Sequence, residues 1–174
     1  LLANTTASNN VAIGLDAATV NTTGAENVAI GQNAFAANTT GGQNVAIGGG
    51  ALDANTTASN NTAVGYASLG ANTTGDRNVA IGYGAADAGD VASRNSVLGY
   101  NALGADTKGS RTVAMGYGAV QTQNFTTATD AYNVGVGYNA LGANTTGTQN
   151  TAVGALALDN NTTATNNTAV GYAS

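Results

Sequence analysis

The sequence contains no cysteine, no histidine, no tryptophan and no proline, and its acidic residues are one glutamate and eight scattered aspartates. The lack of cysteine excludes a disulfide framework and thiolate chemistry. General acid–base and nucleophilic catalysis need a tuned histidine or carboxylate beside the reacting group. Asp53, Asp87 and Asp159 share one place in the sequence repeat, but they fall on non-adjacent copies, so we expect no close carboxylate pair. We therefore expect a protein that is not an enzyme and needs no cofactor.

Charge is scarce as well, because only 7% of the residues are charged and the net charge is −5. A nucleic acid or an anionic membrane would favour a basic face, so neither is an expected partner. No apolar run approaches the roughly 20 residues that span a bilayer, and we expect no membrane insertion in this segment. The phosphate-binding G-x-G-x-x-G and calcium-binding G-G-x-G-x-D patterns are also missing, which argues against nucleotide and metal sites.

What the sequence does contain is a five-residue phrase, Asn-Val-Ala-Ile-Gly at 78–82, that occurs ten times with small variations. Its glycines are 17 residues apart except in one place, where they are 21 apart. A short fixed period with one insertion predicts a solenoid, in which each repeat is a coil stacked on the last. The glycines are Gly14, Gly31, Gly48, Gly65, Gly82, Gly99, Gly116, Gly137, Gly154 and Gly171.

The repeat covers the whole chain, so we expect a single repeat domain at residues 1–174. Its coils start near residues 10, 27, 44, 61, 78, 95, 112, 133, 150 and 167, and the insertion falls within 121–132. Leu1 and Ser174 both lie inside a repeat, and neither end has the atypical polar cap that usually shields a solenoid. We expect the chain to be a piece of a longer fibre.

Each coil can be numbered from its first asparagine, so that the shared glycine is position 5. Positions 2 and 4 alternate with position 3, which is the period of a strand rather than a helix. Position 4 is always large and apolar, and position 3 is small. This predicts a strand whose small position 3 faces outward against another backbone. We expect a second short strand around positions 8 and 9, and then a loop formed by Asn-Thr-Thr-Gly.

Two positions predict columns that run along the stack. The glycine at position 5 indicates a turn with positive φ, or a place too narrow for a Cβ atom. The asparagine at position 12 indicates a ladder of amides hydrogen-bonded from coil to coil. N-glycosylation is the alternative, although coils about 4.8 Å apart leave little room for a glycan on each. These asparagines are Asn4, Asn21, Asn38, Asn55, Asn72, Asn144 and Asn161.

Large aliphatic residues are few, at about three in each coil. Such a thin core gains little from burial against the entropy of ordering 17 residues. We therefore expect self-association, which would bury the small-residue faces of the coils.

The sequence of the repeats resembles that of a known protein family. The segments Asn78-Val79-Ala80-Ile81-Gly82-Tyr83 and Asn95-Ser96-Val97-Leu98-Gly99-Tyr100 resemble the head repeat of trimeric autotransporter adhesins, although a 17-residue coil is longer than that family's usual unit. The resemblance implies a left-handed parallel β-roll of three chains, displayed on a surface for attachment. Similar arrays of N-T-A-V-G and N-T-T-G also resemble segments of phage and virus tail fibres.

Two further columns have alternative interpretations. Tyrosine occupies position 6 in several coils, where it would cover a seam between chains or stack on a sugar. Paired threonines at positions 13 and 14 suggest an ice-binding surface, but neighbouring residues point to opposite faces and leave one threonine column. The tyrosines are Tyr66, Tyr83, Tyr100, Tyr117, Tyr138 and Tyr172.

The most distinctive region runs from residue 76 to 132 and contains every cation of the chain. Three arginines lie at position 17 of consecutive coils, so like charges should stack and need an anion beside them. One interpretation is a salt-bridge ladder with Asp76, Asp90 and Asp106. The other is a ligand belt for an acidic glycan or a carboxylate, next to the loop that the insertion forms. The belt comprises Arg77, Arg94, Lys108, Arg111, Phe125 and Tyr132.

The sequence therefore predicts an all-β, parallel β-solenoid, or β-roll, of about ten 17-residue coils, homotrimeric and, from the resemblance, left-handed. The expected function is a stiff extracellular fibre segment on a cell surface or virion, which contacts a host surface, matrix protein or glycan. A tail-fibre segment for host recognition and an ice-binding solenoid are the alternatives.

Overall fold

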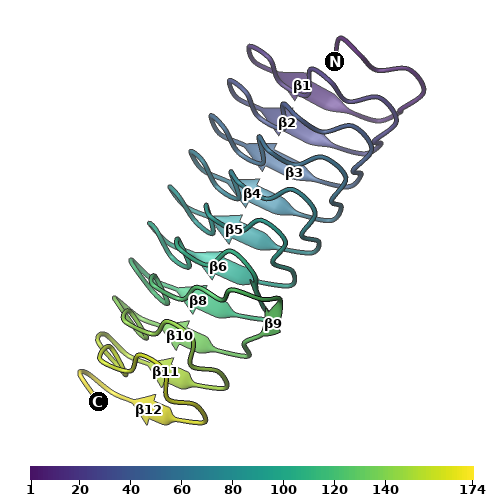
Figure 1. Ribbon diagram of the computed structural model, residues 1–174. Helices are drawn as coiled ribbons and strands as arrows, with labels where there is room; N and C mark the ends of the chain where they lie inside the picture. The colour runs from purple at the N-terminus through teal and green to yellow at the C-terminus, as the bar shows by residue number, and fades with distance from the viewer.

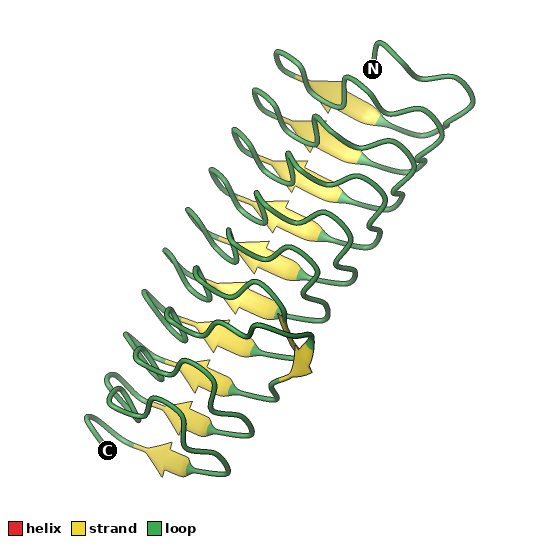
Figure 2. Ribbon diagram, viewed as in Figure 1, coloured by secondary structure: helices red, strands yellow, loops and turns green.

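The computed structural model describes residues 1–174 as an all-β stack with no helix (Figures 1 and 2). Ten three-residue strands form one parallel sheet along a side of the stack, and the two termini lie at its opposite ends. The strands, in sheet order, are β1 (Val11–Ile13), β2 (Val28–Ile30), β3 (Val45–Ile47), β4 (Thr62–Val64), β5 (Val79–Ile81), β6 (Ser96–Leu98), β8 (Val113–Met115), β10 (Val134–Val136), β11 (Thr151–Val153) and β12 (Thr168–Val170).

Each strand residue pairs with the residue at the same position of the next coil, as Ala63 of β4 pairs with Ala80 of β5. The register confirms the predicted parallel β-solenoid with its 17-residue spacing. Both reasons expected for the position 5 glycine hold. Gly48 has a φ of 133°, and a Cβ atom there would lie 2.5 Å from the carbonyl oxygen of Gly65 in the next coil. Only glycine combines this backbone conformation with so close a neighbour.

The two faces of the sheet are the reverse of the prediction. Position 3 points into the coil, where Ala63 is fully buried, while positions 2 and 4 point outward. The reason is the thinness of the coil, whose interior is filled from the opposite wall by position 9. At Gly135 a Cβ atom would lie 2.6 Å from Cγ2 of Val120, which is at position 9 of the preceding coil. Val97 and Ala86 show the opposite combination at the same two positions. Val97 is larger than the usual alanine at position 3, and Ala86, at position 9 of the preceding coil, is smaller than the usual residue there.

As a result, positions 2 and 4 form an aliphatic stripe on the outside of the sheet, from β1 to β12. None of its residues is charged, since these two positions hold only Val, Ile, Leu, Met, Thr and Ser in all ten coils. Even in the middle of the stack the side chains are open to solvent, with 39% of Ile81 and 48% of Leu98 exposed. The stripe is a long apolar surface that this chain does not cover.

The second strand that we expected around positions 8 and 9 is wrong, because this wall consists of turns. Positions 7 and 9 adopt the left-handed conformation, with φ of 56° at Asn33 and 57° at Phe35, and an extended strand cannot contain such residues. The turns still stack closely, as the Phe35 N–H donates to the Ala51 carbonyl oxygen at 2.9 Å. Of the 104 backbone hydrogen bonds, 19 join strand residues to one another. The other 85 include bonds that extend the sheet at the strand ends, such as that from the Val28 N–H to the Asn44 carbonyl oxygen, and bonds between turns, so both walls hold the stack together.

The insertion enters after Asn124, as the pairing shows. Thr107 Oγ1 donates to Asn124 Oδ1, 17 residues further on, so Asn124 keeps the regular spacing. The short strands β7 (Gly109–Ser110) and β9 (Thr129–Asp130) then pair at a spacing of 20, and β8 pairs with β10 at a spacing of 21. Three extra residues therefore precede β9 and one follows it. The strand β9 stands at the side of the stack, away from the main sheet (Figure 1).

Candidate functional site

The position 12 asparagines form a buried amide column in the N-terminal half of the stack. The Asn38 amide donates to Asn21 Oδ1 at 2.7 Å, and Asn55 and Asn72 continue the column at 3.0 and 3.1 Å. These four side chains are almost completely buried, and Asn144 is buried as well, which leaves no room for a glycan on any of them. Asn4 and Asn161, near the two ends, donate only to carbonyl oxygens of their own turns.

A second amide column, at position 1, was not anticipated from the sequence. The Asn44 backbone N–H donates to Asn27 Oδ1 at 2.9 Å, and Asn61 and Asn78 repeat the contact at the same distance. The signal was present in the sequence, because the repeated phrase begins with asparagine in almost every coil. From the coil of Asn21 to the coil of Asn72, side-chain amides therefore hold each coil to the next at two places.

The position 12 column is interrupted between Asn72 and Asn144, where Gly89, Asp106 and Gln123 take the place of asparagine. The buried Asn72 Oδ1 faces the coil of Gly89 and has no hydrogen-bond partner. The Asp106 carboxylate is buried and accepts hydrogen bonds from the Gly109 N–H at 2.9 Å and the Gln123 amide at 2.7 Å. Burial raises the pKa of Asp106 in spite of these hydrogen bonds.

Gln123 links the two amide columns where both are altered. Its Nε2 donates to the Thr112 hydroxyl at 3.0 Å, and Thr112 replaces the position 1 asparagine of that coil. Its Oε1 accepts from the Asn133 amide at 2.7 Å, which belongs to the next member of the position 1 column. The longer glutamine side chain thus compensates for the missing asparagine at position 1.

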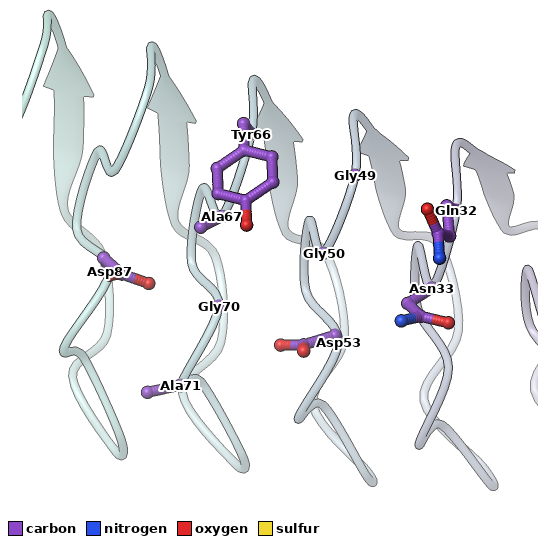
Figure 3. A pocket seen from close by; sticks show the side chains of 10 residues that line it. All are labelled: Gln32, Asn33, Gly49, Gly50, Asp53, Tyr66, Ala67, Gly70, Ala71 and Asp87. Atoms are coloured by element: carbon purple, nitrogen blue, oxygen red, sulfur yellow. The ribbon is translucent and has the colours of Figure 1, made fainter.

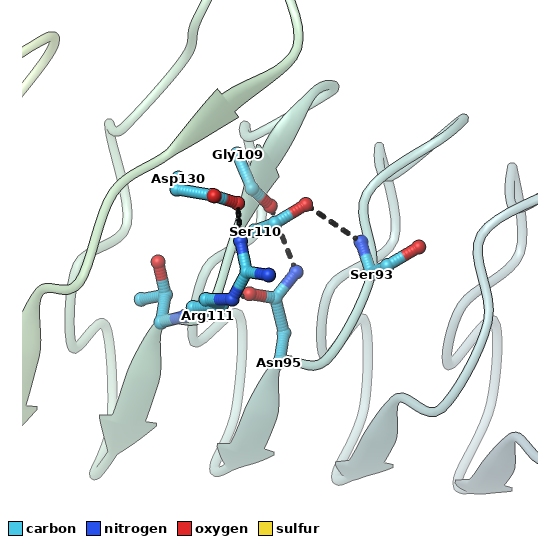
Figure 4. Close-up of polar contacts among 7 residues, drawn as sticks. Ser93, Asn95, Gly109, Ser110, Arg111 and Asp130 are labelled. Atoms are coloured by element: carbon cyan, nitrogen blue, oxygen red, sulfur yellow. Dashed lines mark hydrogen bonds and ion pairs between the residues drawn. The ribbon is translucent and has the colours of Figure 1, made fainter.

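Four of the six residues of the predicted ligand belt hold the insertion onto the stack. Arg111 forms an ion pair with Asp130 of β9 (Figure 4). The Arg111 guanidinium also lies 5.5 Å from the ring centroid of Tyr132. Lys108 Nζ donates to the Thr126 carbonyl oxygen at 3.3 Å, and only 6% of Phe125 is exposed. These four side chains therefore hold the inserted loop against the stack.

The other two belt residues, Arg77 and Arg94, are exposed and form no ion pair. The interpretation in which three aspartates neutralise the arginine column is wrong, since each aspartate has another partner. Asp76 Oδ1 accepts from the Ser59 N–H at 2.7 Å, Asp90 Oδ1 accepts from the Thr73 hydroxyl at 2.6 Å, and Asp106 is buried as described. Two arginines one coil apart are therefore free to meet an external anion.

Five of the position 6 tyrosines form a stack on the outside of the chain. Neighbouring ring centroids from Tyr66 to Tyr138 lie 5.1–5.5 Å apart, with interplanar angles of 5–18°. The stack ends at Tyr138, because the next coil has Ala155 at this position, and Tyr172 lies beyond it. At the other end the position is held by Gly49 and Gln32, so one face of Tyr66 has no ring beside it.

A pocket of about 430 Å³ opens at this free end of the tyrosine stack (Figure 3). It is lined by Tyr66, by Gln32 and Asn33, and by the carboxylates of Asp53 and Asp87. We expected no close carboxylate pair at position 10, and Asp53 and Asp87 do lie two coils apart, yet they line the same pocket because residue 70 between them is a glycine. A Cβ atom at Gly70 would lie 2.7 Å from Asp87 Oδ1, which therefore extends over the glycine.

The two carboxylates of the pocket influence each other. Burial raises the pKa of Asp53, and it raises the pKa of Asp87 with a further contribution from repulsion by Asp53. A second pocket of about 460 Å³ lies on the other side of Asp87 and is lined by Asn101 and Gln121. That pocket contains one carboxylate and no aromatic ring.

Comparisons with protein-family models, with curated proteins and with solved structures find no match to this chain. None of its segments forms a helix long and apolar enough to cross a membrane. No three histidine, cysteine, aspartate or glutamate side chains are grouped as metal ligands would be.

Proposed function

We propose that the chain is a stiff segment of an extracellular fibre, on a cell surface or a virion, in which three copies wind together and present attachment contacts along their sides. The observation that carries this proposal is the aliphatic stripe, which runs along the whole of a continuously hydrogen-bonded stack. The resemblance of the coils to adhesin head repeats supports the number three and the surface location.

Stiffness follows from the way the coils are joined. Backbone hydrogen bonds of the sheet and the turns join each coil to its neighbours, and buried amide columns add to them over much of the stack, so no section is free to bend as a linker would. Nine steps separate Gly14 from Gly171, and at about 4.8 Å each they give a rod of about 43 Å. A longer array of the same repeat would form a longer rod with the same contacts between neighbouring coils.

The stripe supports association with further copies. An exposed apolar surface of this length is unusual for a chain that stays alone in water and marks an interaction surface. Because it is straight and has the same spacing in every coil, a second copy with the same spacing matches it along its full length. This differs from the earlier expectation that the small position 3 face would be covered, since position 3 is inside the coil.

Attachment contacts are provided by the exposed arginines and the neighbouring loop. Arg77 and Arg94 carry positive charge without an ion-pair partner on a chain that is acidic overall. Their guanidinium groups suit sulfate or carboxylate groups, which they can bind with two hydrogen bonds. An acidic glycan on a host surface is the ligand class that fits them.

The ice-binding alternative has less support. The threonines at position 13 use their hydroxyls within the stack, as Thr22 Oγ1 donates to the Thr39 carbonyl oxygen at 2.9 Å. A single exposed threonine column, at position 14, remains for ice. Thermal hysteresis in a solution of the chain would reverse this preference. A tail fibre would use the same rod, and a particle-attachment sequence in the flanking chain would distinguish it.

The attachment role is tested on surfaces coated with a sulfated or a sialylated glycan. The double variant Arg77→Gln/Arg94→Gln should bind such a surface about tenfold more weakly than the unmodified chain, because two exposed ionic contacts are lost. Arg111→Gln is the matched control and should change binding less, since Arg111 already pairs with Asp130. If the double variant binds as well as the unmodified chain, the two arginines do not make the contact.

A further inference from the structure

We propose that the pocket at the free end of the tyrosine stack is a binding site for a guanidinium group, such as an arginine side chain presented by a partner protein. The site lies among Gln32, Asn33, Asp53, Tyr66 and Asp87, and it shares no residue with the arginine belt. The proposal goes beyond the fibre role and does not depend on it, because it concerns a cationic ligand at a different place on the stack.

One face of the Tyr66 ring is free. In four successive contacts from Tyr66 to Tyr138, each ring covers its neighbour at 5.1–5.5 Å. On the other side of Tyr66 the next position is Gly49, and a Cβ atom there would lie 3.4 Å from Cδ2 of the ring. The space that another ring would occupy is therefore vacant and belongs to the pocket, and 60% of Tyr66 is exposed.

The pocket also holds two negative charges without a cationic partner. Neither Asp53 nor Asp87 forms an ion pair, although both line the same pocket, and only backbone N–H groups, those of Asp53 and Ala54, are close enough to favour the charged form of Asp53. Asp87 comes close because residue 70 is a glycine, and the two carboxylates repel each other. A cation between them would remove this repulsion and gain an attraction to both.

The pocket is also lined by two side-chain amides, those of Gln32 and Asn33. Gln32 and Asn33 make no side-chain hydrogen bond within the chain, whereas the asparagines of the two columns are bonded along the stack. Figure 3 shows the Asp53 side chain on the coil next to that of Tyr66, and the Gln32 and Asn33 side chains on the coil beyond it. Amide oxygens and carboxylates together can accept the several N–H groups that a guanidinium presents in one plane.

This combination selects a guanidinium over other cations. A guanidinium is flat, stacks on an aromatic face, and donates two parallel hydrogen bonds to a carboxylate. Calcium needs six to eight oxygen ligands, and the ring would contribute none. The second pocket provides an internal contrast, since it uses the same Asp87 but has no aromatic ring and no second carboxylate.

The test is a titration of the purified chain with argininamide, followed by the NMR signals of the Tyr66 ring. Citrullinamide is the matched probe, because it has the same shape and the same α-amino group but an uncharged side chain. We expect saturable binding of argininamide that is at least tenfold tighter than that of citrullinamide, as is typical when a charge-assisted bidentate contact is lost. Equal affinity for the two probes, or no saturable binding of argininamide, would overturn the proposal.

Variants locate the binding in this pocket. Asp53→Asn/Asp87→Asn should weaken argininamide binding at least tenfold, while Asp159→Asn should leave it unchanged, although it removes a charge from the same coil position elsewhere. Tyr66→Phe should retain binding and Tyr66→Leu should weaken it severalfold, because only the ring face is needed. An equal effect of Asp159→Asn, or tighter binding of calcium chloride that Tyr66→Leu does not change, would contradict a guanidinium site. Unchanged melting temperatures would show that the variants fold.

Discussion

The coils that contain Asn21 to Asn72 and those that contain Gly89 to Gln123 have the same backbone but different contents. In the first region the position 12 column is an unbroken chain of amide hydrogen bonds, and the three coils from residue 27 to 77 carry few charges. In the second region the column contains a glycine, a buried carboxylate and a glutamine, and the insertion follows directly. The second region also contains most of the cations of the chain.

The comparison shows that the backbone geometry of the stack does not depend on which residues fill the position 12 column. The position 5 glycines and the strand register continue through both regions without change, so they determine the geometry of the stack. The position 12 column can be interrupted without loss of that geometry. Charged side chains and the extra loop are found where the column is interrupted.

The largest effect is expected at the glycines that both regions share. Gly48→Ala, in the regular region, places a Cβ atom 2.5 Å from the next coil and forces alanine to a φ of 133°. We expect the free energy of unfolding to fall by about 3 kcal/mol or more, from overlap and backbone strain together. Denaturant unfolding measures the change.

Gly89→Ala is the control for this substitution. Its Cβ atom would meet its nearest neighbours at 3.4 Å or more, and its φ is not positive, so little destabilisation is expected. A similar loss of stability in both variants would show that the position 5 column does not determine the geometry.

A smaller effect is expected within the amide column. Asn38→Ala removes hydrogen bonds to Asn21, Asn55 and Gly41 in a buried place. The expected loss is about 2–3 kcal/mol, because partners are left buried without a hydrogen bond. Asn144→Ala should cost less, since Asn144 Oδ1 has no partner and its amide donates only to Gly147. Equal losses would show that the hydrogen bonds from coil to coil along the column add nothing to those within a turn.

The buried carboxylate predicts a dependence on pH. Because burial raises the pKa of Asp106, the folded chain holds this proton more tightly than the unfolded chain does. The contribution of Asp106 to stability is therefore complete below the unfolded pKa of about 3.9, and it is lost as the pH rises through the folded pKa. Asp106→Asn should raise the free energy of unfolding by about 1 kcal/mol at pH 7, and this gain should shrink towards pH 3. A gain that is independent of pH would contradict the assignment.

The smallest effect is expected from repair of the column. Gly89→Asn offers an amide to the buried Asn72 Oδ1, which has no partner. The variant should be about 1 kcal/mol more stable than Gly89→Ala, which fills the position without an amide. Thermal unfolding of the two variants gives the difference. If they are equally stable, the interruption at Gly89 has no energetic consequence.

Much of the fold could be predicted from the sequence, because a repeat of fixed length expresses a local constraint ten times. The glycine at every seventeenth residue predicted the length of the coil, the parallel register and an unusual backbone conformation at position 5. The asparagine at position 12 predicted the amide column for the same reason. These predictions required only that each coil repeat the one before it.

The orientation of the sheet could not be predicted, because it depends on the width of the coil. An alternating pattern such as that of Val79, Ala80 and Ile81 separates two faces but does not indicate which is inside. Small residues face inward here because position 9 fills the interior from the opposite wall. The second strand was wrong because alanine and leucine at positions 8 and 9 do not reveal left-handed residues such as Leu52.

The candidate sites could not be predicted, because they depend on how far side chains extend towards neighbouring coils, and the spacing of the repeat does not indicate this. Asp53 and Asp87 lie two coils apart in sequence, and they share a pocket only because Gly70 leaves space between them. Likewise, the repeat placed Arg111 in a column with two other arginines, but the insertion supplied Asp130 as its partner. Both results come from departures from the repeat rather than from the repeat itself.

The most direct test of the account is the mass of the chain in solution, measured by sedimentation equilibrium. Association through the aliphatic stripe predicts a particle of three times 16.8 kDa, about 50 kDa. Ile81→Glu, which places a charge on the stripe, should lower this mass towards that of one chain, whereas Thr57→Glu, at an exposed position outside the stripe, should not. A stable monomer of the unmodified chain, or a trimer unaffected by Ile81→Glu, would contradict the account.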